Sequence, residues 1–331
     1  MIDRSELPLP FGAVEDEVAE AVARFKAVLD GTEFRSELGR LAEKEWRWGT
    51  PLEVSVRALK AHRRRCTFDV TISTASGRHG VIAKVHNVDR SDAFRTMDAV
   101  WRAGFSADAE CAIPQPLAYL SSLHIMLEEK VEGPPAMEVF LAGDADEQLA
   151  TADRCGRWLA RFHAAAPCLG DATDQLRLER WTARIRPFGE PLASAAELLL
   201  RTLEGAAPTP DTVAWCAGHG SYMPEHVLLS GPRTVTIDFD EYDVADPGRD
   251  LAWFIVSLQR LGLKHRGSLR FFDAAVEEFL RAYAASGPAG ATVHVAFYRA
   301  AECLHRAWRD LYKRIPPIRE WAQLMLEEGL S

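Results

Sequence analysis

Two acidic residues close an apolar run in the second half of the chain, where Asp238 and Asp240 end the segment TVTIDFD. A carboxylate at the end of an apolar strand is exposed, and residues two apart along a strand can point to the same side. Mg²⁺ takes hard oxygen ligands, typically one or two carboxylates together with substrate phosphates. The pair therefore predicts either the metal-binding end of a phosphate-handling site or an acidic turn between a strand and a helix.

The segment GHGSYMPEH, just upstream, carries the polar residues His219, Ser221 and His226. A histidine in a cleft titrates near neutrality and can act as a general acid or base. The run GHGSYM is not the G-x-S-x-G nucleophile elbow, because Met223 stands where the second glycine must be. We therefore do not expect Ser221 to be an acyl-transfer nucleophile, and the two histidines are candidates for either catalysis or support of the loop.

The elements that must position these residues change character along the chain. Helical spacing of apolar residues dominates the first fifty residues, alternating β-branched segments follow, and the rest is largely helical apart from HVLLSGPRTVTIDFD. The breaker Glu132-Gly133-Pro134-Pro135 separates the last two parts. We predict an α+β fold of two lobes with a cleft between them. Its parts are an N-terminal helical extension (1–50), a mostly-β N-lobe of about five strands (51–133) and a larger helical C-lobe (134–331).

Several motifs together resemble the aminoglycoside phosphotransferase and choline kinase superfamily. The run IDFD at 237–240 with ADPGRDLA at 245–252 is similar to that family's "IDF/W…GDPxxDLA" block. HGSYMPEH is similar to its "HGDxHxxN" catalytic loop, and VIAK at 81–84 to the strand with its phosphate-binding lysine. LEEKVEG at 127–133 resembles the hinge that receives the adenine. The resemblance covers roughly residues 50–320 and implies a bilobal protein-kinase-like fold.

The resemblance also implies roles for residues of the C-terminal motifs and the lysine strand. Lys84 would supply positive charge to the phosphates of ATP or GTP, and Asp238 would bind Mg²⁺ with Asp240 as a further candidate. Asp250 would brace the backbone of the catalytic loop near His219.

Other positions of the N-lobe match the family less well. Glu129 lies in the hinge, and Arg64 lies in LKAHRRRC, where the family has its phosphate-covering loop. The arginines there either contact phosphates or an acidic ligand, or form only a solvated hairpin. The helical stretch DAFRTMDAVWRAG contains no Glu to pair with Lys84, so the shorter Asp92 or Asp98 would have to substitute.

Two departures fall within the catalytic loop itself. Ser221 replaces the family's catalytic Asp, and His226 replaces its metal-binding Asn. General-base assistance contributes typically about 10²- to 10⁴-fold, and imidazole is a poorer ligand than an oxygen for a hard ion. These departures indicate a repurposed or pseudokinase-like member, and the alternative is an active ATP- or GTP-dependent phosphotransferase of a small hydroxylated molecule. Some members of the superfamily act in the maturation of ribosomally made peptides, and this implies a further role. The cleft would then hold a dehydrated peptide, His226 would help deprotonate a cysteine thiol for thioether ring closure, and a partner enzyme of the same pathway is expected.

The composition of the sequence limits which classes of partner the protein is expected to bind. A net charge of −9 argues against a nucleic-acid binder. The sequence has neither an apolar run long enough to span a membrane nor a signal peptide, so we expect a cytoplasmic protein.

The six cysteines form no CxxC pair and predict free thiols rather than a zinc site. Helices between Gln175 and Pro208 and at the C-terminus would shape an acceptor pocket, with Trp181, Arg184, Trp308 and Arg309 as candidate lining residues.

Overall fold

A computed structural model describes residues 11–172, 176–314 and 316–331. The chain divides into two compact units, and each is described by itself. The first unit runs to residue 108 and includes 113–132, and the second comprises 109–112 and 133–331. The segment MIDRSELPLP, on which the expectation about a signal peptide rests, lies outside the described residues.

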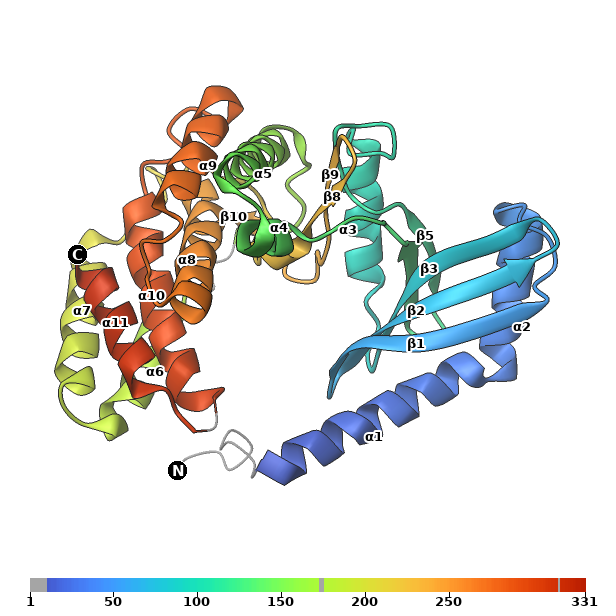
Figure 1. The fold of residues 1–331 in the computed structure, drawn as a ribbon, viewed down its shortest axis with the longest axis horizontal. Helices are drawn as coiled ribbons and strands as arrows, with labels where there is room; N and C mark the ends of the chain where they lie inside the picture. The colour runs from blue at the N-terminus through green and yellow to red at the C-terminus, as the bar shows by residue number, and fades with distance from the viewer. Residues whose placement is uncertain (1–10, 173–175, 315) are drawn as a thin grey trace. The chain divides into compact units, whose positions relative to one another are not determined.

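The first unit is built on one antiparallel sheet whose strand order is β1-β2-β3-β6-β5. Its strands are β1 (Glu53–His62), β2 (Arg65–Thr74), β3 (Gly77–His86), β5 (Pro116–Leu120) and β6 (Ile125–Glu129). The helices of this unit are α1 (Phe11–Asp30), α2 (Thr32–Arg40), which continues as a π-helical turn over Leu41–Glu45, and α3 (Ser91–Arg102). Helix α1 packs along β1 and β2 (Figure 1).

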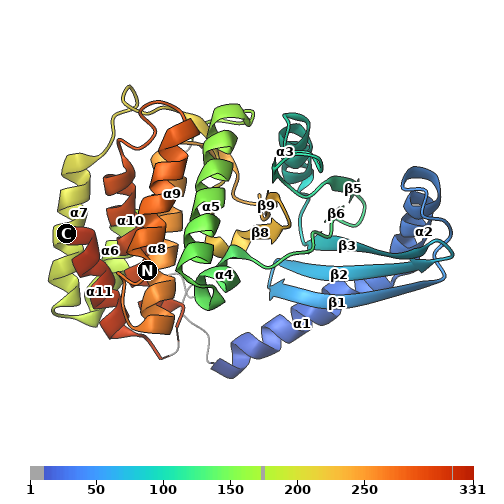
Figure 2. The same ribbon diagram turned by 45° about the horizontal axis from the view of Figure 1, so that its top comes forward.

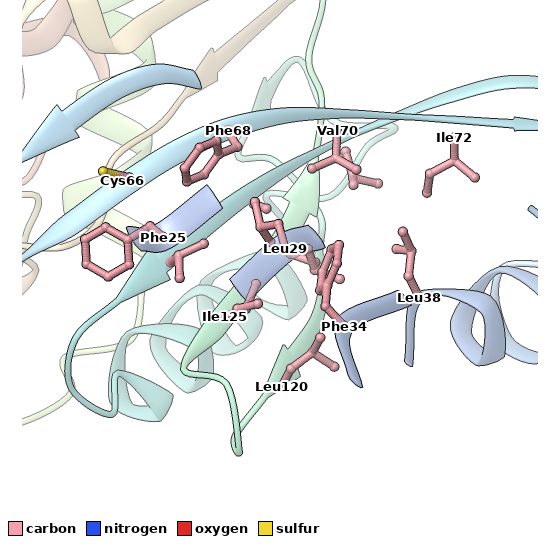
Figure 3. Close-up of a cluster of buried hydrophobic side chains, with 14 of the residues drawn as sticks. Phe25, Leu29, Phe34, Leu38, Cys66, Phe68, Val70, Ile72, Leu120 and Ile125 are labelled. Atoms are coloured by element: carbon pink, nitrogen blue, oxygen red, sulfur yellow. The ribbon is translucent and has the colours of Figure 1, made fainter. Parts of the chain in front are cut away.

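Alternation along the strands gives the sheet two different faces. Apolar residues of β2, β3 and β6 point to the side covered by α1 and α2, where they form a continuous core with Phe25, Leu29, Phe34 and Leu38 (Figure 3). In β3 the core-facing residues are Val81, Ala83 and Val85. Because successive strand residues point to opposite faces, Lys84 lies on the face away from this core.

The second unit is mostly helical. Its longer helices are α4 (Ala136–Ala142), α5 (Ala145–Ala165), α6 (Leu178–Ile185), α7 (Leu192–Ala206), α8 (Pro247–Arg266), α9 (Asp273–Ser286), α10 (Val295–Tyr312) and α11 (Arg319–Leu330). Short 3₁₀ turns span Arg186–Phe188 and Pro224–His226. Two small sheets complete it, one of β7 (Cys216–Gly218) with β10 (Asp243–Ala245), the other of β4 (Cys111–Ala112), β8 (Val227–Ser230) and β9 (Arg233–Thr236).

Helix packing in this unit follows the apolar stripes of the sequence. Helix α5 lies beside α9, and α10 packs against α8 and α11 (Figure 2). In α5 the side chains of Cys155, Trp158, Leu159 and Phe162 form one apolar stripe and are fully buried. Trp158 stacks on Tyr222, with ring centroids 5.4 Å apart, and so ties α5 to the loop that carries the candidate site residues.

The α+β class predicted from the sequence is confirmed, with one five-stranded antiparallel sheet in the first unit and a helical second unit. The segment HVLLSGPRTVTIDFD, which stands apart from the helical pattern of the sequence, forms the antiparallel strands β8 and β9. All six cysteines are free thiols, of which Cys168 is exposed. None of the described helices is long and apolar enough to cross a membrane.

Candidate functional site

The DPGRDLA block forms the start of α8. Its residues cap the helix and bind the helix start to neighbouring elements. The side chain of Asp246 caps the helix by accepting a hydrogen bond of 2.7 Å from the Gly248 amide, and Pro247 stands at the first helical position, where its missing N–H leaves no bond unmade. His294 adds a 2.6 Å contact from Nδ1 to the second oxygen of Asp246. Arg249 binds Asp243 of β10 through two hydrogen bonds, which joins the helix start to the strand before it.

Asp250, one turn into α8, braces the loop that precedes Ser221. Its two carboxylate oxygens accept the backbone N–H of His219 at 2.6 Å and that of Gly220 at 2.9 Å. His163 Nε2 lies 3.2 Å from the same carboxylate, and its Nδ1 lies 2.8 Å from the hydroxyl of Tyr283. Burial raises the pKa of Asp250, but the hydrogen bond with His163 and the charge of Arg249 outweigh it and hold that pKa below its usual range. The brace inferred from the family resemblance is thus present as a network of hydrogen bonds.

Gly220 makes the turn that brings this loop against the segment after β9. Its φ of +77° lies in the left-handed region, which glycine adopts without steric cost. A Cβ at this position would lie 2.1 Å from the carbonyl oxygen of Glu241. Glycine is therefore required here both by backbone conformation and by the close approach of a neighbouring backbone.

His219 is a structural residue of the loop and is held in one tautomer. Its Nε2 lies 3.1 Å from the carbonyl oxygen of Ile237. Because that oxygen can only accept, Nε2 carries the hydrogen and donates the hydrogen bond. Nδ1 then accepts from the backbone N–H of Ser221 at 3.4 Å. Burial lowers the pKa of His219 to about 4, so the ring is neutral at physiological pH. With both nitrogens engaged and no exposure to solvent, His219 is not available as a base.

Ser221, His226 and Asp238 meet in one cluster. The Ser221 hydroxyl lies 3.5 Å from His219 Nδ1 and 3.5 Å from the carbonyl oxygen of Asp238. His226 Nδ1 lies 2.9 Å from the carbonyl oxygen of Ser221, while its Nε2 lies 3.5 Å from the Asp238 carboxylate. Because Nδ1 must donate to the carbonyl, a neutral ring would turn the lone pair of Nε2 towards a carboxylate. The geometry therefore favours the imidazolium, with both nitrogens protonated.

Asp238 adopts an unusual backbone conformation at this cluster. Its φ is +69°, in the left-handed region that Asp and Asn tolerate better than other residues with a side chain. Backbone strain of this kind costs of order 1–3 kcal/mol and concentrates at functional positions. The conformation turns the carboxylate towards His226.

The donor set at Asp238 does not fit a magnesium ion well. One carboxylate facing one imidazole is a mixed nitrogen and oxygen pair, whereas Mg²⁺ takes oxygen ligands in octahedral geometry. No group of three or more His, Cys, Asp or Glu among the described residues is arranged to hold a metal. Asp240, the further candidate, is partly buried. The Asp238 carboxylate thus faces a nitrogen of His226, which is a poor ligand for Mg²⁺.

Lys84, the residue expected to bind phosphates, is buried in the first unit against Glu128. Its Nζ lies 3.1 Å from Glu128 Oε1, and both side chains are at most 6% exposed. The register explains the contact: Ile82 pairs with Glu128 and Lys84 with Met126, so Lys84 and Glu128 are diagonal neighbours on one face. The expectation that Asp92 or Asp98 replaces the helix glutamate is wrong, because these residues pair with Arg90 and Arg102 respectively.

Two other residues suggested for nucleotide binding take local positions in the first unit. Arg64 lies in the two-residue turn between β1 and β2, is exposed, and its carbonyl accepts the Asn87 N–H at 3.0 Å. The carboxylate of Glu129 accepts the backbone N–H of Gln115 at 3.1 Å, and the Glu129 N–H donates to the Gln115 carbonyl. Glu129 thus links β6 to the chain entering β5.

A cavity of about 580 Å³ in the second unit opens beside Gly220, and five of its eleven lining residues carry rings, while four others are charged. Trp181 and Trp308, both suggested as lining residues from the sequence, contribute to it together with Trp253, Tyr298 and His305. Arg309 lines a different cavity, and Arg184 lies over the ring of Tyr312. Glu302 at the aromatic cavity is held by His305 at 2.9 Å and Arg306 at 2.6 Å.

Sequence reasoning missed Glu128 and His163, which hold two of the charged site residues. Glu128 stood within the hinge motif as a charged residue directly after three apolar residues, IML, and that break in an apolar strand was the available signal. His163 lay in the motif RWLARFHAA, but no sequence spacing relates it to Asp250, 87 residues away.

Comparison with known proteins agrees with this architecture. The family model described as "Phosphotransferase enzyme family" matches residues 78–317. Among solved structures, a choline/ethanolamine kinase family protein from Mesorhizobium loti aligns with a TM-score of 0.59 and 16% identity over 92% of this chain and 94% of its own. Comparison with curated proteins gave no match.

Two further solved structures carry nucleotides. An ADP-bound aminoglycoside phosphotransferase aligns with a TM-score of 0.54 and 14% identity over 91% of this chain and 97% of its own. An amicoumacin kinase in complex with AMP-PNP and Ca²⁺ aligns with a TM-score of 0.55 and 13% identity over 83% and 86%. At these identities the likeness shows the fold, which is the kinase-like fold expected from the motifs. With its family model spanning most of the chain, this protein belongs to the phosphotransferase enzyme family that includes the aminoglycoside phosphotransferases.

Proposed function

We propose that this chain is a repurposed, pseudokinase-like member of its family, which binds a nucleotide through Lys84 but does not carry out the family's metal-dependent phosphoryl transfer. The observation that carries the proposal is the cluster of His226, Asp238 and Ser221. His226 Nε2 faces the Asp238 carboxylate at 3.5 Å, and a serine stands at the position where the resemblance places the catalytic carboxylate.

The proposal that a nucleotide still binds rests on Lys84. Within the described part of the chain, its buried Nζ has no hydrogen bond of satisfactory geometry and only the ion pair with Glu128. A buried ammonium carries three donors, so capacity remains for phosphate oxygens. ATP or GTP would supply the phosphates, and Glu128 would keep the lysine side chain in place.

The proposed loss of transfer follows from the chemistry of the loop. Ser221 cannot accept a proton from an acceptor hydroxyl at neutral pH, and His219 is buried and neutral with both nitrogens engaged. His226 in its doubly protonated form has no lone pair to accept a proton. Phosphoryl transfer relies mainly on positioning and on metal ions that neutralise developing charge, and the imidazolium beside Asp238 opposes a second cation there.

Calorimetry and a turnover assay test the proposal together. We expect ATP to bind the wild-type chain with an affinity that changes little when Mg²⁺ is omitted, and without measurable ADP formation. The double variant Ser221→Asp/His226→Asn restores the family's groups, so binding should become Mg²⁺-dependent and ATP hydrolysis should rise by roughly 10²-fold or more. Ser121→Asp/His124→Asn is a matched control, since it makes the same chemical changes in the turn between β5 and β6, outside the cluster.

Two results would contradict the proposal. Mg²⁺-dependent hydrolysis by the wild-type chain that Asp238→Ala abolishes would establish the alternative, an active phosphotransferase. The aromatic cavity beside Gly220 favours that alternative, because it offers an organic acceptor a place next to the loop. Absence of ATP binding under any condition would leave the fold without a nucleotide and remove the role of Lys84.

Action on a peptide, with thioether ring closure and a partner enzyme, stays a prediction. It requires His226 to take a proton from a cysteine thiol. The contacts of His226 with the Ser221 carbonyl and the Asp238 carboxylate favour the charged ring, so the proposal above does not extend to that chemistry.

A further inference from the structure

A second cavity in the helical unit, of about 390 Å³, is lined by an unusual concentration of positive charge. Its lysine and arginine residues are Arg260, Lys264, Arg306, Arg309, Lys313 and Arg314, with His265 beside them. Only two carboxylates line it, those of Glu225 and Asp310. The chain as a whole carries a net charge of −9, so the positive charge of this cavity is opposite in sign to that of the whole chain. We refer to this cavity as the basic pocket.

The basic pocket is formed by consecutive turns of two packed helices. Residues 260, 264 and 265 belong to α8, and residues 306, 309 and 310 belong to α10. Positions three and four apart share one helix face, so each helix presents its cations in the same direction. Met223 and Glu225 of the catalytic-loop segment form part of the wall, which places the basic pocket beside the loop that carries Ser221 and His226.

Internal ion pairs satisfy only part of this charge. Arg260 binds Asp310 at 2.5 Å and lies over the ring of Trp321. Arg306 binds Glu302 at 2.6 Å. Among the described residues, no carboxylate forms an ion pair with Arg309 or Lys313. Burial lowers the pKa of Arg260, and the neighbouring charges of Arg306 and Arg314 lower it further against the opposing effect of Asp310. Crowded cations repel one another, and a bound anion would relieve that repulsion.

The remaining wall indicates the form of the ligand. Met137, Met223, Leu261 and Trp321 provide apolar contact surface. Guanidinium groups bind phosphate oxygens through paired, charge-assisted hydrogen bonds. A site with several such groups and an apolar wall suits a dianionic head attached to an organic body.

We infer that the basic pocket binds a small phosphate monoester, with the cations of α8 and α10 around the phosphate and the apolar wall around the organic part. The inference is independent of whether the chain binds a nucleotide or transfers phosphate, because it concerns residues other than Lys84, Ser221 and His226.

Calorimetric titration with phenyl phosphate tests this site. We compare Arg309→Gln/Lys313→Gln with a matched control, Arg95→Gln/Arg201→Gln, which removes two exposed cations that do not line the basic pocket. A charge-assisted hydrogen bond contributes about 1.5–3 kcal/mol, so the first variant should bind phenyl phosphate at least about tenfold more weakly. The control should bind as the wild type does. All four residues are exposed, and equal melting temperatures would show that both variants fold.

Two reference ligands sharpen the assignment. Benzoate carries the same ring with a single charge, and inorganic phosphate carries the head without the ring, so both should bind more weakly than phenyl phosphate. Equal affinity for benzoate, or for inorganic phosphate, would overturn the assignment to a phosphate monoester. Absence of phenyl phosphate binding, or equal weakening in both variants, would overturn the site itself.

Discussion

Two sides of one loop differ in how firmly their charges are held. On the bracing side, Asp250 is 1% exposed and accepts two backbone N–H groups at 2.6 and 2.9 Å. On the reactive side, Asp238 has a side chain that is 17% exposed and faces His226 at 3.5 Å. Asp250 holds the loop through buried hydrogen bonds to its backbone, whereas Asp238 and His226 are held by a longer contact between partly exposed side chains. The backbone of the loop and its polar side chains are therefore held by different residues, so substitutions on one side can leave the other in place.

The largest expected effect is on the bracing side. Asp250→Asn removes the charge and one of the acceptors for the His219 and Gly220 amides, leaving buried donors without a partner. Breaking such a network costs several kcal/mol, and we expect the free energy of unfolding to fall by about 5 kcal/mol. Denaturant titration followed by circular dichroism measures it. Asp238→Asn is the matched substitution on the reactive side, and an equal loss there would remove the contrast.

Lys84 extends the comparison, because it too lies in a buried ion pair, and within the described residues Glu128 is its one ionic partner. Lys84→Met leaves Glu128 buried without a counter-charge and should lower the free energy of unfolding by about 4 kcal/mol. Adding Glu128→Leu replaces the pair with apolar side chains and should restore stability to within about 1 kcal/mol of wild type. If the double variant is no more stable than the single one, burial of the pair is not the cause.

Acid should weaken the bracing side through His219. Because burial lowers its folded-state pKa from 6.5 to about 4, the unfolded chain binds more protons between these values. The stability from the neutral ring is complete above pH 6.5 and is lost as the pH falls towards 4, by about 3 kcal/mol. Unfolding titrations at pH 7, 5.5 and 4 measure the slope. His86, whose pKa burial also lowers to about 4, contributes with the same sign.

The two histidines can be separated by substitution. His219→Gln should flatten the dependence of stability on pH, and His86→Gln should remove the remaining part from the first unit. A slope unchanged in His219→Gln would mean that this residue is not kept neutral by burial in the folded chain.

The smallest expected effect is on the reactive side. His226→Gln removes an ion pair at 3.5 Å between side chains that are 12% and 17% exposed. Such a pair lies between exposed pairs, which contribute about 0.2–1 kcal/mol, and fully buried ones, whose disruption costs about 3–5 kcal/mol, so we expect a loss of about 1–2 kcal/mol. Asp238→Asn keeps a residue type that tolerates the left-handed backbone, so its cost should be similar. Melting temperatures of the two variants and of their combination measure this. A loss comparable to that of Asp250→Asn would show that the cluster supports the fold.

Much of the fold followed from local patterns. Alternation predicted the strands of the first unit, helical spacing predicted the helical second unit, and the family resemblance implied the brace by Asp250. The partner of Lys84 could not be predicted in the same way. Asp92 and Asp98 lie on the next helix along the chain, which is why the sequence suggested them as partners of Lys84. Glu128 reaches Lys84 through the register of β3 and β6, strands separated by about forty residues.

The family resemblance and the positions of the loop and of the acidic block could be predicted from the residues alone. These follow from residue identity and short-range spacing, which the chain carries without folding. Only the tertiary structure decided that His226 faces Asp238, that Glu128 pairs with Lys84, and that cations of α8 and α10 surround one cavity. Each of these joins groups distant in the sequence, and their energy depends on distance and burial, which packing sets.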